Sequence, residues 1–211
     1  MADRLSLYDY LGFVVPGATI LFAVIYGMDG WPRAAPGSSA LVGLVAAAFV
    51  IGYANASVGN ALEPVFLGAR VGTWPDPLWG TLAVKSRYSA ETREYHAAVL
   101  AKRYPGVGQP TAYKLAYTEL QQLKLDGPLQ LTNQHIGFAR GMATACLIGL
   151  LVTVGAGLGG RSHLPLTVWV PAFAGATMLF VQRYRRAWFR FGDGVLSGIA
   201  LVDRTCVGTV D

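Results

Sequence analysis

Residues 141–160, GMATACLIGLLVTVGAGLGG, contain no Asp, Glu, Lys or Arg. A helix needs about 20 mainly apolar residues to cross the roughly 30 Å hydrocarbon core of a bilayer. Three further stretches are equally free of these charged residues, namely 10–28, 34–62 and 162–182. The sequence therefore predicts an all-α membrane protein with four transmembrane helices. The four spans are expected at about 10–28, 39–57, 140–159 and 164–182.

The composition of the whole chain supports a membrane protein. Of its 211 residues, 53% are hydrophobic and only 14% are charged, whereas about a quarter of the residues of a soluble domain are charged. Cys146 and Cys206 lie far apart in the sequence and are expected to be two free thiols. An ordinary cytosolic enzyme, a secreted disulfide scaffold and a disordered tail are excluded.

The distribution of basic residues predicts the orientation in the membrane. The short connections 29–33 and 161–163 contain only Arg33 and Arg161, and all other Lys and Arg residues lie in the N-terminus, the middle segment and the tail. By the positive-inside rule, both termini and the middle segment are expected in the cytoplasm. The net charge of +5 is then explained by topology and anionic headgroups, and we expect no nucleic-acid partner.

The segment between the second and third spans, about 61–139, is expected to form a cytoplasmic helical module. Ser89 is a suitable N-cap for its first helix, and Thr111 is a suitable N-cap for the second. The last helix of the segment is expected to continue without a break into the third span, over about 129–158. With no flexible linker or internal repeat, the chain is expected to form one domain over residues 1–211.

Polar residues next to the spans are the candidate contact sites. Asn133, Ile136 and Arg140 share one helix face at positions i, i+3 and i+7, and Asn60 and Glu63 share another at i and i+3. We expect these five residues to contact a second copy or a partner protein. Because Glu63 and Arg140 both lie where a span ends, they are also expected to form an ion pair.

A basic and aromatic segment, QRYRRAWFR at 182–190, directly follows the fourth span. Arginine and aromatic side chains at a membrane boundary are typical of an interfacial anchor. The anchor residues are expected to be Arg183, Arg185, Arg186 and Trp188, at the start of a cytoplasmic tail over 183–211. Single-strand nucleic-acid binding is the alternative for such a segment, but its position directly after a span favours the anchor.

Two small-residue features predict how the spans pack. Pro16-Gly17 lies inside the first span, where proline removes a helical hydrogen bond and is expected to kink the helix. Gly43 and Ala47 in the second span are spaced for close contact with another helix.

No pattern of residues indicates catalysis. His96, His135 and His163 lie far apart, and no zinc, nucleophile-elbow or phosphate-loop motif is present. Glu91 and Glu94 share a helix face, but His96 lies off it, so a metal site is not expected. We expect no enzyme activity, cofactor or metal. A lipid-modifying enzyme is the alternative, with Glu63, His96 and His135 as its candidate residues.

The opening LSLYDYLGFVVPG at 5–17, together with the helix at 133–140 that runs into a span, resembles small multi-span effectors of bacterial anti-phage defence systems. The resemblance implies a location in the bacterial inner membrane and an oligomeric protein that disrupts or depolarises that membrane when triggered. It also implies a cytoplasmic sensor protein as a partner. The alternative function is a non-conducting membrane anchor or subunit that tethers a sensor or enzyme.

Overall fold

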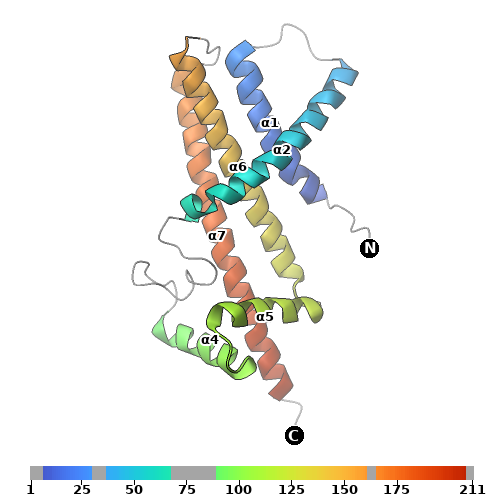
Figure 1. The fold of residues 1–211 in the computed structure, drawn as a ribbon, viewed down its shortest axis with the longest axis vertical. Helices are drawn as coiled ribbons and strands as arrows, with labels where there is room; N and C mark the ends of the chain where they lie inside the picture. The colour runs from blue at the N-terminus through green and yellow to red at the C-terminus, as the bar shows by residue number, and fades with distance from the viewer. Residues whose placement is uncertain (1–6, 30–36, 68–88, 161–164, 208–211) are drawn as a thin grey trace. The chain divides into compact units, whose positions relative to one another are not determined.

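The computed structural model describes residues 7–29, 37–67, 89–160 and 165–207. All regular secondary structure in these residues is helical (Figure 1). In chain order the elements are α1 (Leu7–Val24), the π-helical turn η1 (Ile25–Asp29), α2 (Ser38–Leu67), α4 (Ala90–Arg103), α5 (Gln109–Gln122), α6 (Gly127–Leu158) and α7 (Leu166–Val207).

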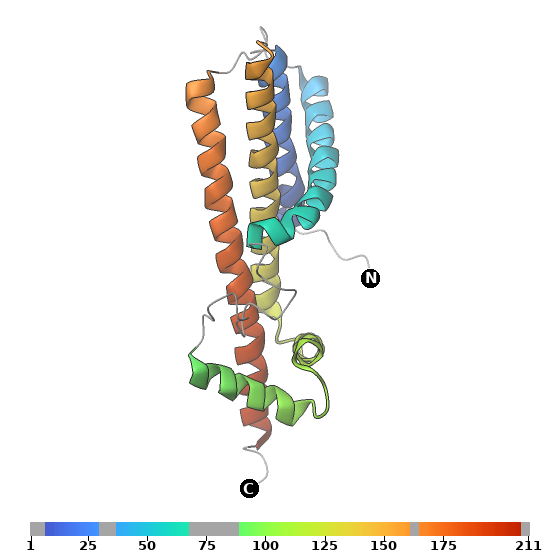
Figure 2. The same cartoon turned by 60° about the vertical axis from the view of Figure 1, so that its left-hand side comes forward.

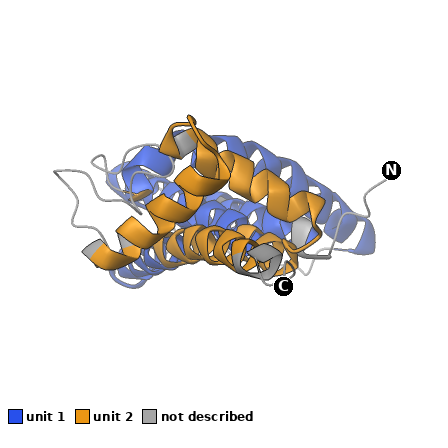
Figure 3. Ribbon diagram, turned by 90° about the horizontal axis from the view of Figure 1, so that it is seen from below, with its two compact units in different colours: residues 1–66, 134–184 blue, residues 67–133, 185–211 orange. Residues whose placement is uncertain are grey.

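The chain divides into two compact units, coloured separately in Figure 3. Unit 1 consists of Met1–Phe66 and Gln134–Tyr184, and unit 2 consists of Leu67–Asn133 and Arg185–Asp211. Helices α6 and α7 each contribute residues to both units. Unit 1 contains α1, nearly all of α2, α6 from Gln134 and α7 up to Tyr184. Unit 2 contains α4, α5, the start of α6 and α7 from Arg185.

Three helices are long and apolar enough to cross a membrane: the segment Tyr10–Gly27, α2 and α6. They correspond to the first three expected spans. The fourth expected span begins at residue 164, outside the described residues, and its described part forms the start of α7. The charge-free part of α7 runs from Leu166 to Gln182 and is shorter than the charge-free parts of the other three helices, because Arg183 follows it directly. The membrane-protein class is thus supported by three helices.

Helices α1 and α2 cross at a contact between their backbones (Figures 1 and 2). A β-carbon at Gly17 would lie 1.8 Å from the Ala48 carbonyl oxygen, and one at Gly52 would lie 1.8 Å from the Phe13 carbonyl oxygen. Only glycine permits such an approach. Gly43, by contrast, is exposed and a β-carbon there would contact nothing. The close small-residue contact of α2 with α1 thus lies at Ala48 and Gly52, five residues after the Gly43 and Ala47 pair that the spacing indicates.

Pro16 does not divide α1, which continues as one helix from Leu7 to Val24. Its ring is fully buried, and its Cγ lies 3.3 Å from the position that a β-carbon at Gly141 of α6 would occupy. The Pro16-Gly17 pair is thus a packing point at which α1 contacts both α6 and α2.

The apolar core of unit 1 joins α1, α6 and α7. Its buried members are Ala23, Met142, Cys146 and Phe173. Partly buried apolar side chains surround them: Val15, Phe22, Phe138, Leu150, Trp169, Ala176 and Phe180. Phe22 and Trp169 connect α1 with α7, with ring centroids 5.0 Å apart.

Helix α4 begins as the sequence predicts, because the Ser89 hydroxyl accepts a hydrogen bond from the Thr92 backbone N–H at 3.1 Å. The start of α5 differs from the prediction. Its N-cap is Gly108, with a proline in the first turn, and Thr111 already lies inside the helix. Proline suits the first turn because its missing N–H would have no intrahelical partner there.

Helix α7 continues far beyond the expected fourth span, as one helix from Leu166 to Val207. The residues expected to form a tail are therefore helical up to Val207. Buried apolar side chains recur along this part at helical spacing, with Tyr184, Trp188, Phe191 and Val195 on one face. This pattern stabilises the helix and could have been read from the sequence.

Candidate functional site

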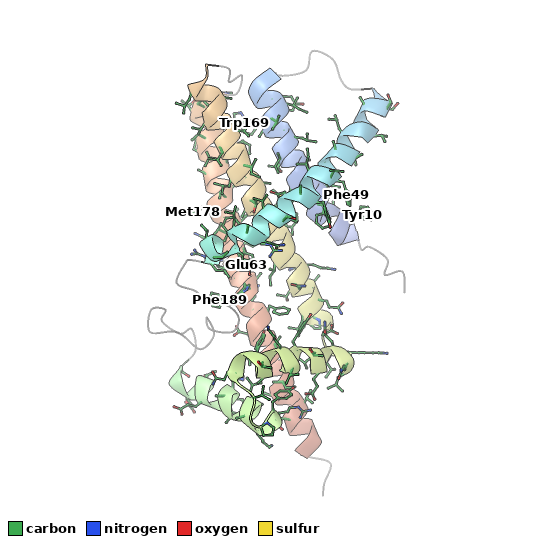
Figure 4. All side chains as sticks on the ribbon, viewed as in Figure 1. Tyr10, Phe49, Glu63, Trp169, Met178 and Phe189 are labelled. Atoms are coloured by element: carbon green, nitrogen blue, oxygen red, sulfur yellow. The ribbon has the colours of Figure 1, made fainter. Side chains whose placement is uncertain are left out.

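The ion pair that the sequence predicts is present in unit 1. The Arg140 guanidinium donates from Nη1 to Oε2 of Glu63 at 2.9 Å and thereby joins α6 to α2. Both side chains are partly buried, with 22% of Arg140 and 29% of Glu63 exposed. Figure 4 labels Glu63 near the C-terminal end of α2. A charged contact thus joins the two helices where the apolar stretch of α2 has ended.

The ion pair is one end of a longer polar contact. One and two turns before Glu63, the same face of α2 carries Gly59 and Asn55. The Asn55 side chain donates from Nδ2 to the Gly141 carbonyl oxygen at 2.9 Å. A β-carbon at Gly59 would lie 3.1 Å from the Thr144 hydroxyl oxygen, so glycine lets the helices approach there.

We call this contact the α2–α6 polar seam. It consists of Asn55, Gly59 and Glu63 on α2 and Arg140, Gly141 and Thr144 on α6.

The polar seam is incompletely hydrogen-bonded within the described residues. Asn55 is 3% exposed, yet its Oδ1 atom has no hydrogen-bond partner there. Thr144 is fully buried and donates its hydroxyl to the Arg140 carbonyl oxygen of its own helix at 3.0 Å. A buried acceptor without a donor is unfavourable, so Asn55 has hydrogen-bonding capacity that this arrangement does not use.

Tyr184 of α7 lies beside the ion pair. Its side chain is fully buried, and its hydroxyl makes no hydrogen bond of standard geometry within the described residues. Burial raises the pKa of the Tyr184 hydroxyl most strongly, and the negative charge of Glu63 raises it further. The positive charge of Arg140 lowers it in part. The ring packs edge-on against Phe66, with centroids 6.4 Å apart. The Tyr184 side chain thus places an apolar ring and a neutral hydroxyl beside the ion pair of Glu63 and Arg140.

The other predicted contact residues lie outside the polar seam. Asn60 and Asn133 are exposed, whereas Ile136 is buried at 8% exposure. Asn133 belongs to unit 2, while Ile136 and Arg140 belong to unit 1. The structure thus brings Glu63 and Arg140 together, and their contacts with a second copy or partner remain predictions.

The expected interfacial anchor has two kinds of side chain. Arg183, Arg185 and Arg186 are exposed, as an anchor requires. Trp188 differs from the expectation, because it is only 2% exposed and its ring cannot lie among lipid headgroups. The reason is helical periodicity, which puts Trp188 on the buried face of α7 with Tyr184. The arginines remain candidates for the interface.

Unit 2 is held by a network of charges between α4, α5 and α7. The Arg103 guanidinium pairs with the Glu119 carboxylate, which also accepts a hydrogen bond from the Tyr104 hydroxyl. Asp203 of α7 lies 3.0 Å from Lys102 Nζ and 3.9 Å from Arg103 Nη1. The hydrogen bonds from Arg103 hold the pKa of Glu119 below its usual range.

Apolar grooves occur in both units. In unit 1 a groove of about 390 Å³ lies between α1 and α2 and is lined by Val14, Leu21, Phe22, Leu44, Val45 and other apolar residues. In unit 2 a groove of about 430 Å³ is lined by Leu120, Leu125, Leu129, Leu201, Val202 and neighbouring small residues. The unit 2 groove borders Leu125 and Leu201, whose large side chains are more than half exposed.

Metal-ligating side chains do not gather in the part of the chain that the structure describes, where no three His, Cys, Asp or Glu residues could hold an ion. His96 is buried on α4, and burial lowers the pKa of its imidazole. Glu91 and Glu94 of the same helix are exposed.

No protein-family model, curated protein or solved structure matches this chain significantly. The resemblance to anti-phage defence effectors therefore rests on residues 5–17 and 133–140 alone. What the chain does is inferred from its own helices and from the polar seam.

Proposed function

We propose that this chain is a bacterial inner-membrane protein with four spans that acts by assembling with further copies. In the assembled and triggered state it disrupts or depolarises the membrane, as the resemblance to defence effectors implies. The proposal includes a fourth span at about 164–182, cytoplasmic termini and a cytoplasmic module around α4 and α5. It involves no cofactor and no catalytic step.

The observation that carries this proposal is the low burial of α2. Only 17% of its most apolar window is buried within the chain, compared with 44% for α6. Large apolar side chains such as Val42, Val50 and Tyr53 are more than 60% exposed on it. A helix with so few contacts in its own chain has most of its surface available for lipid or for another copy.

The polar seam supports assembly for a second reason. A polar side chain in a span is usually directed toward other helices, because an unsatisfied polar group in hydrocarbon is unfavourable. Asn55 satisfies that rule only in part, since its Oδ1 atom lacks a partner in the described residues. Because this atom is itself enclosed within the chain, a donor can reach it only when α2 and α6 rearrange, as assembly with further copies would require.

The test combines membrane potential with assembly state. The chain is expressed in bacteria with a potential-sensitive dye, and the detergent-extracted protein is analysed by native mass spectrometry. Depolarisation together with a defined oligomer is the expected result, and co-expression with a sensor from its genomic neighbourhood is expected to supply the trigger if one is required. A strict monomer with an unchanged potential in both conditions would exclude the proposal.

The second candidate function is a non-conducting anchor for a soluble protein. The exposed leucines around the unit 2 groove favour it, because exposed apolar clusters often mark protein contacts. This function predicts a normal membrane potential and a soluble partner that co-purifies in stoichiometric amount. Leu125→Glu and Leu201→Glu are then expected to release the partner, whereas the exposed-site variant Lys114→Glu is expected to retain it.

A further inference from the structure

We propose that α2 is an exchangeable helix, which docks through the polar seam either on α6 of its own chain or on α6 of a second copy. The occupant of the α6 surface in the assembled protein is then α2 of another copy. This inference rests on the proposed assembly and names the contact that produces it. It assigns a surface of this chain to one specific partner, a second identical chain.

The first reason is that the two sides of the seam complement each other in charge and shape. Glu63 on α2 meets Arg140 on α6 at 2.9 Å, and Asn55 meets the Gly141 carbonyl oxygen at 2.9 Å. Gly59 leaves room for Thr144. Every chain carries both sides, so any α2 can form the same contacts with the α6 of any other copy.

The second reason is that few large apolar side chains of α2 are buried. The buried residues of α2 are Ala48, Gly52, Asn55, Gly59 and Phe66, and only Phe66 among them has a large apolar side chain. Directional polar contacts and close backbone approach therefore account for most of its association within unit 1. In an exchanged pair these contacts re-form unchanged, and few interlocked side chains have to separate before α2 leaves its own chain.

The third reason is that an undocked α2 would leave unpaired charges behind. Arg140 would lose the acceptor at Glu63, and the Gly141 carbonyl would lose the Asn55 amide. Partly buried polar groups without partners are unfavourable, so the undocked state is not a stable end state. Two arrangements form the ion pair and the hydrogen bond of the polar seam, namely a closed single chain and an exchanged assembly.

Cysteine cross-linking between chains tests this inference directly. The β-carbons at positions 59 and 144 would be at most about 4.5 Å apart, within disulfide range, because a Gly59 β-carbon lies 3.1 Å from the oxygen bonded to the Thr144 β-carbon. Two differently tagged chains are co-expressed on a Cys146→Ala, Cys206→Ala background. One carries Gly59→Cys and the other carries Thr144→Cys, and membranes are oxidised before extraction.

A disulfide between the two tagged chains is the expected product. The matched control replaces Gly59→Cys by Gly43→Cys, an exposed α2 position where a β-carbon would contact nothing, and reports random collisions. Exchange predicts several-fold more interchain product for 59 with 144 than for 43 with 144. Interchain product at the control level overturns the inference.

A second pair of variants covers the case in which Gly59→Cys disturbs folding. One tagged chain carries Glu63→Lys and the other carries Arg140→Glu, so each chain alone has two like charges in its seam. With exchange, α2 of the first chain meets α6 of the second with opposite charges. The mixed pair is then expected to co-purify several-fold better than either variant with itself, and equal co-purification contradicts exchange.

These outcomes separate the inference from the proposed function. Native mass spectrometry that shows an oligomer, together with cross-linking at the control level, leaves assembly intact and excludes exchange. A monomer in native mass spectrometry with no interchain product excludes both. Depolarisation is not needed for either conclusion.

Discussion

Gly17 of α1 and Ala48 of α2 lie backbone to backbone, so that a β-carbon at Gly17 would be 1.8 Å from the Ala48 carbonyl oxygen. On the next turn Gly52 approaches the Phe13 carbonyl in the same way. Aromatic side chains pack around this crossing, with Phe13 and Phe49 rings 5.8 Å apart. The lack of side chains at Gly17 and Gly52 therefore allows the two backbones to approach, and aromatic rings pack beside this crossing.

We expect Gly17→Ala to destabilise unit 1 by about 2 kcal/mol or more, since overpacking of a tight contact typically costs about 1–3 kcal/mol and here the added methyl group meets backbone. Chemical denaturation in detergent micelles measures the loss. Gly12→Ala on the same helix is the control, because a β-carbon there contacts nothing. Equal changes in the free energy of unfolding for Gly17→Ala and Gly12→Ala would contradict a close backbone contact at Gly17.

The sequence predicts the helical part of this fold because its signals are local. Absence of charge over a long apolar run predicts the three helices that are long and apolar enough to cross a membrane. Ser89 predicts the start of α4 through a hydrogen bond to a residue three positions away. The full extent of α7 differs from the prediction, because arginines at 183–190 are also typical of the boundary of a span. The buried side chains of Tyr184, Trp188, Phe191 and Val195 recur every three or four residues, so one helix has a buried apolar face and an exposed charged face there.

The ion pair between Glu63 and Arg140 is expected to show energetic coupling. A double-mutant cycle with Glu63→Gln and Arg140→Gln should give about 0.6 kcal/mol and at most about 1.7 kcal/mol, the average and the maximum for polar contacts between helices in membranes. Denaturation in micelles gives the four free energies of unfolding. Asn60 is an exposed neighbour on α2, so the cycle of Asn60→Ala with Arg140→Gln is expected to show no coupling. Zero coupling between Glu63 and Arg140 as well would show that their ion pair does not stabilise the polar seam.

The sequence predicts only the charged end of the polar seam. Opposite charges at the ends of two spans suggest a pair without knowledge of the packing. The remainder depends on which faces of α2 and α6 meet, and the apolar character around both helices gives little preference. The spacing of Asn55, Gly59 and Glu63 at i, i+4 and i+8 on one face was the available signal, because glycine between two polar residues permits close approach.

Lys124 has a φ of 55°, a left-handed conformation that is unfavourable for side chains other than glycine. It follows the end of α5, where Leu125 N–H donates to the Leu120 carbonyl at 2.9 Å and Lys124 N–H donates to the Gln121 carbonyl at 3.0 Å. Helices that end in this way usually have glycine at this position. Lys124→Gly is therefore expected to stabilise unit 2 by about 0.5–1 kcal/mol.

Hydrogen–deuterium exchange of α5 measures this effect as slower exchange of its last turn. The control is Lys114→Gly, also exposed but inside α5, which is expected to destabilise the helix by about 1 kcal/mol. Faster exchange in Lys124→Gly than in the parent chain would show that the lysine side chain itself contributes to the helix end.

The carboxylate of Glu119 makes the stability of unit 2 dependent on pH. Arg103 lowers its pKa in the folded state, so the unfolded state binds the proton first as pH falls. The stabilisation is complete above the ordinary glutamate pKa of 4.5 and is lost as pH falls through the lower folded value. The parent chain is thus expected to exchange α4 and α5 amides more slowly than Glu119→Gln at neutral pH, with the ratio approaching one in acid. Glu94→Gln, an exposed site on α4, controls for the loss of a carboxylate, and a ratio independent of pH would exclude the Arg103 contact as the cause.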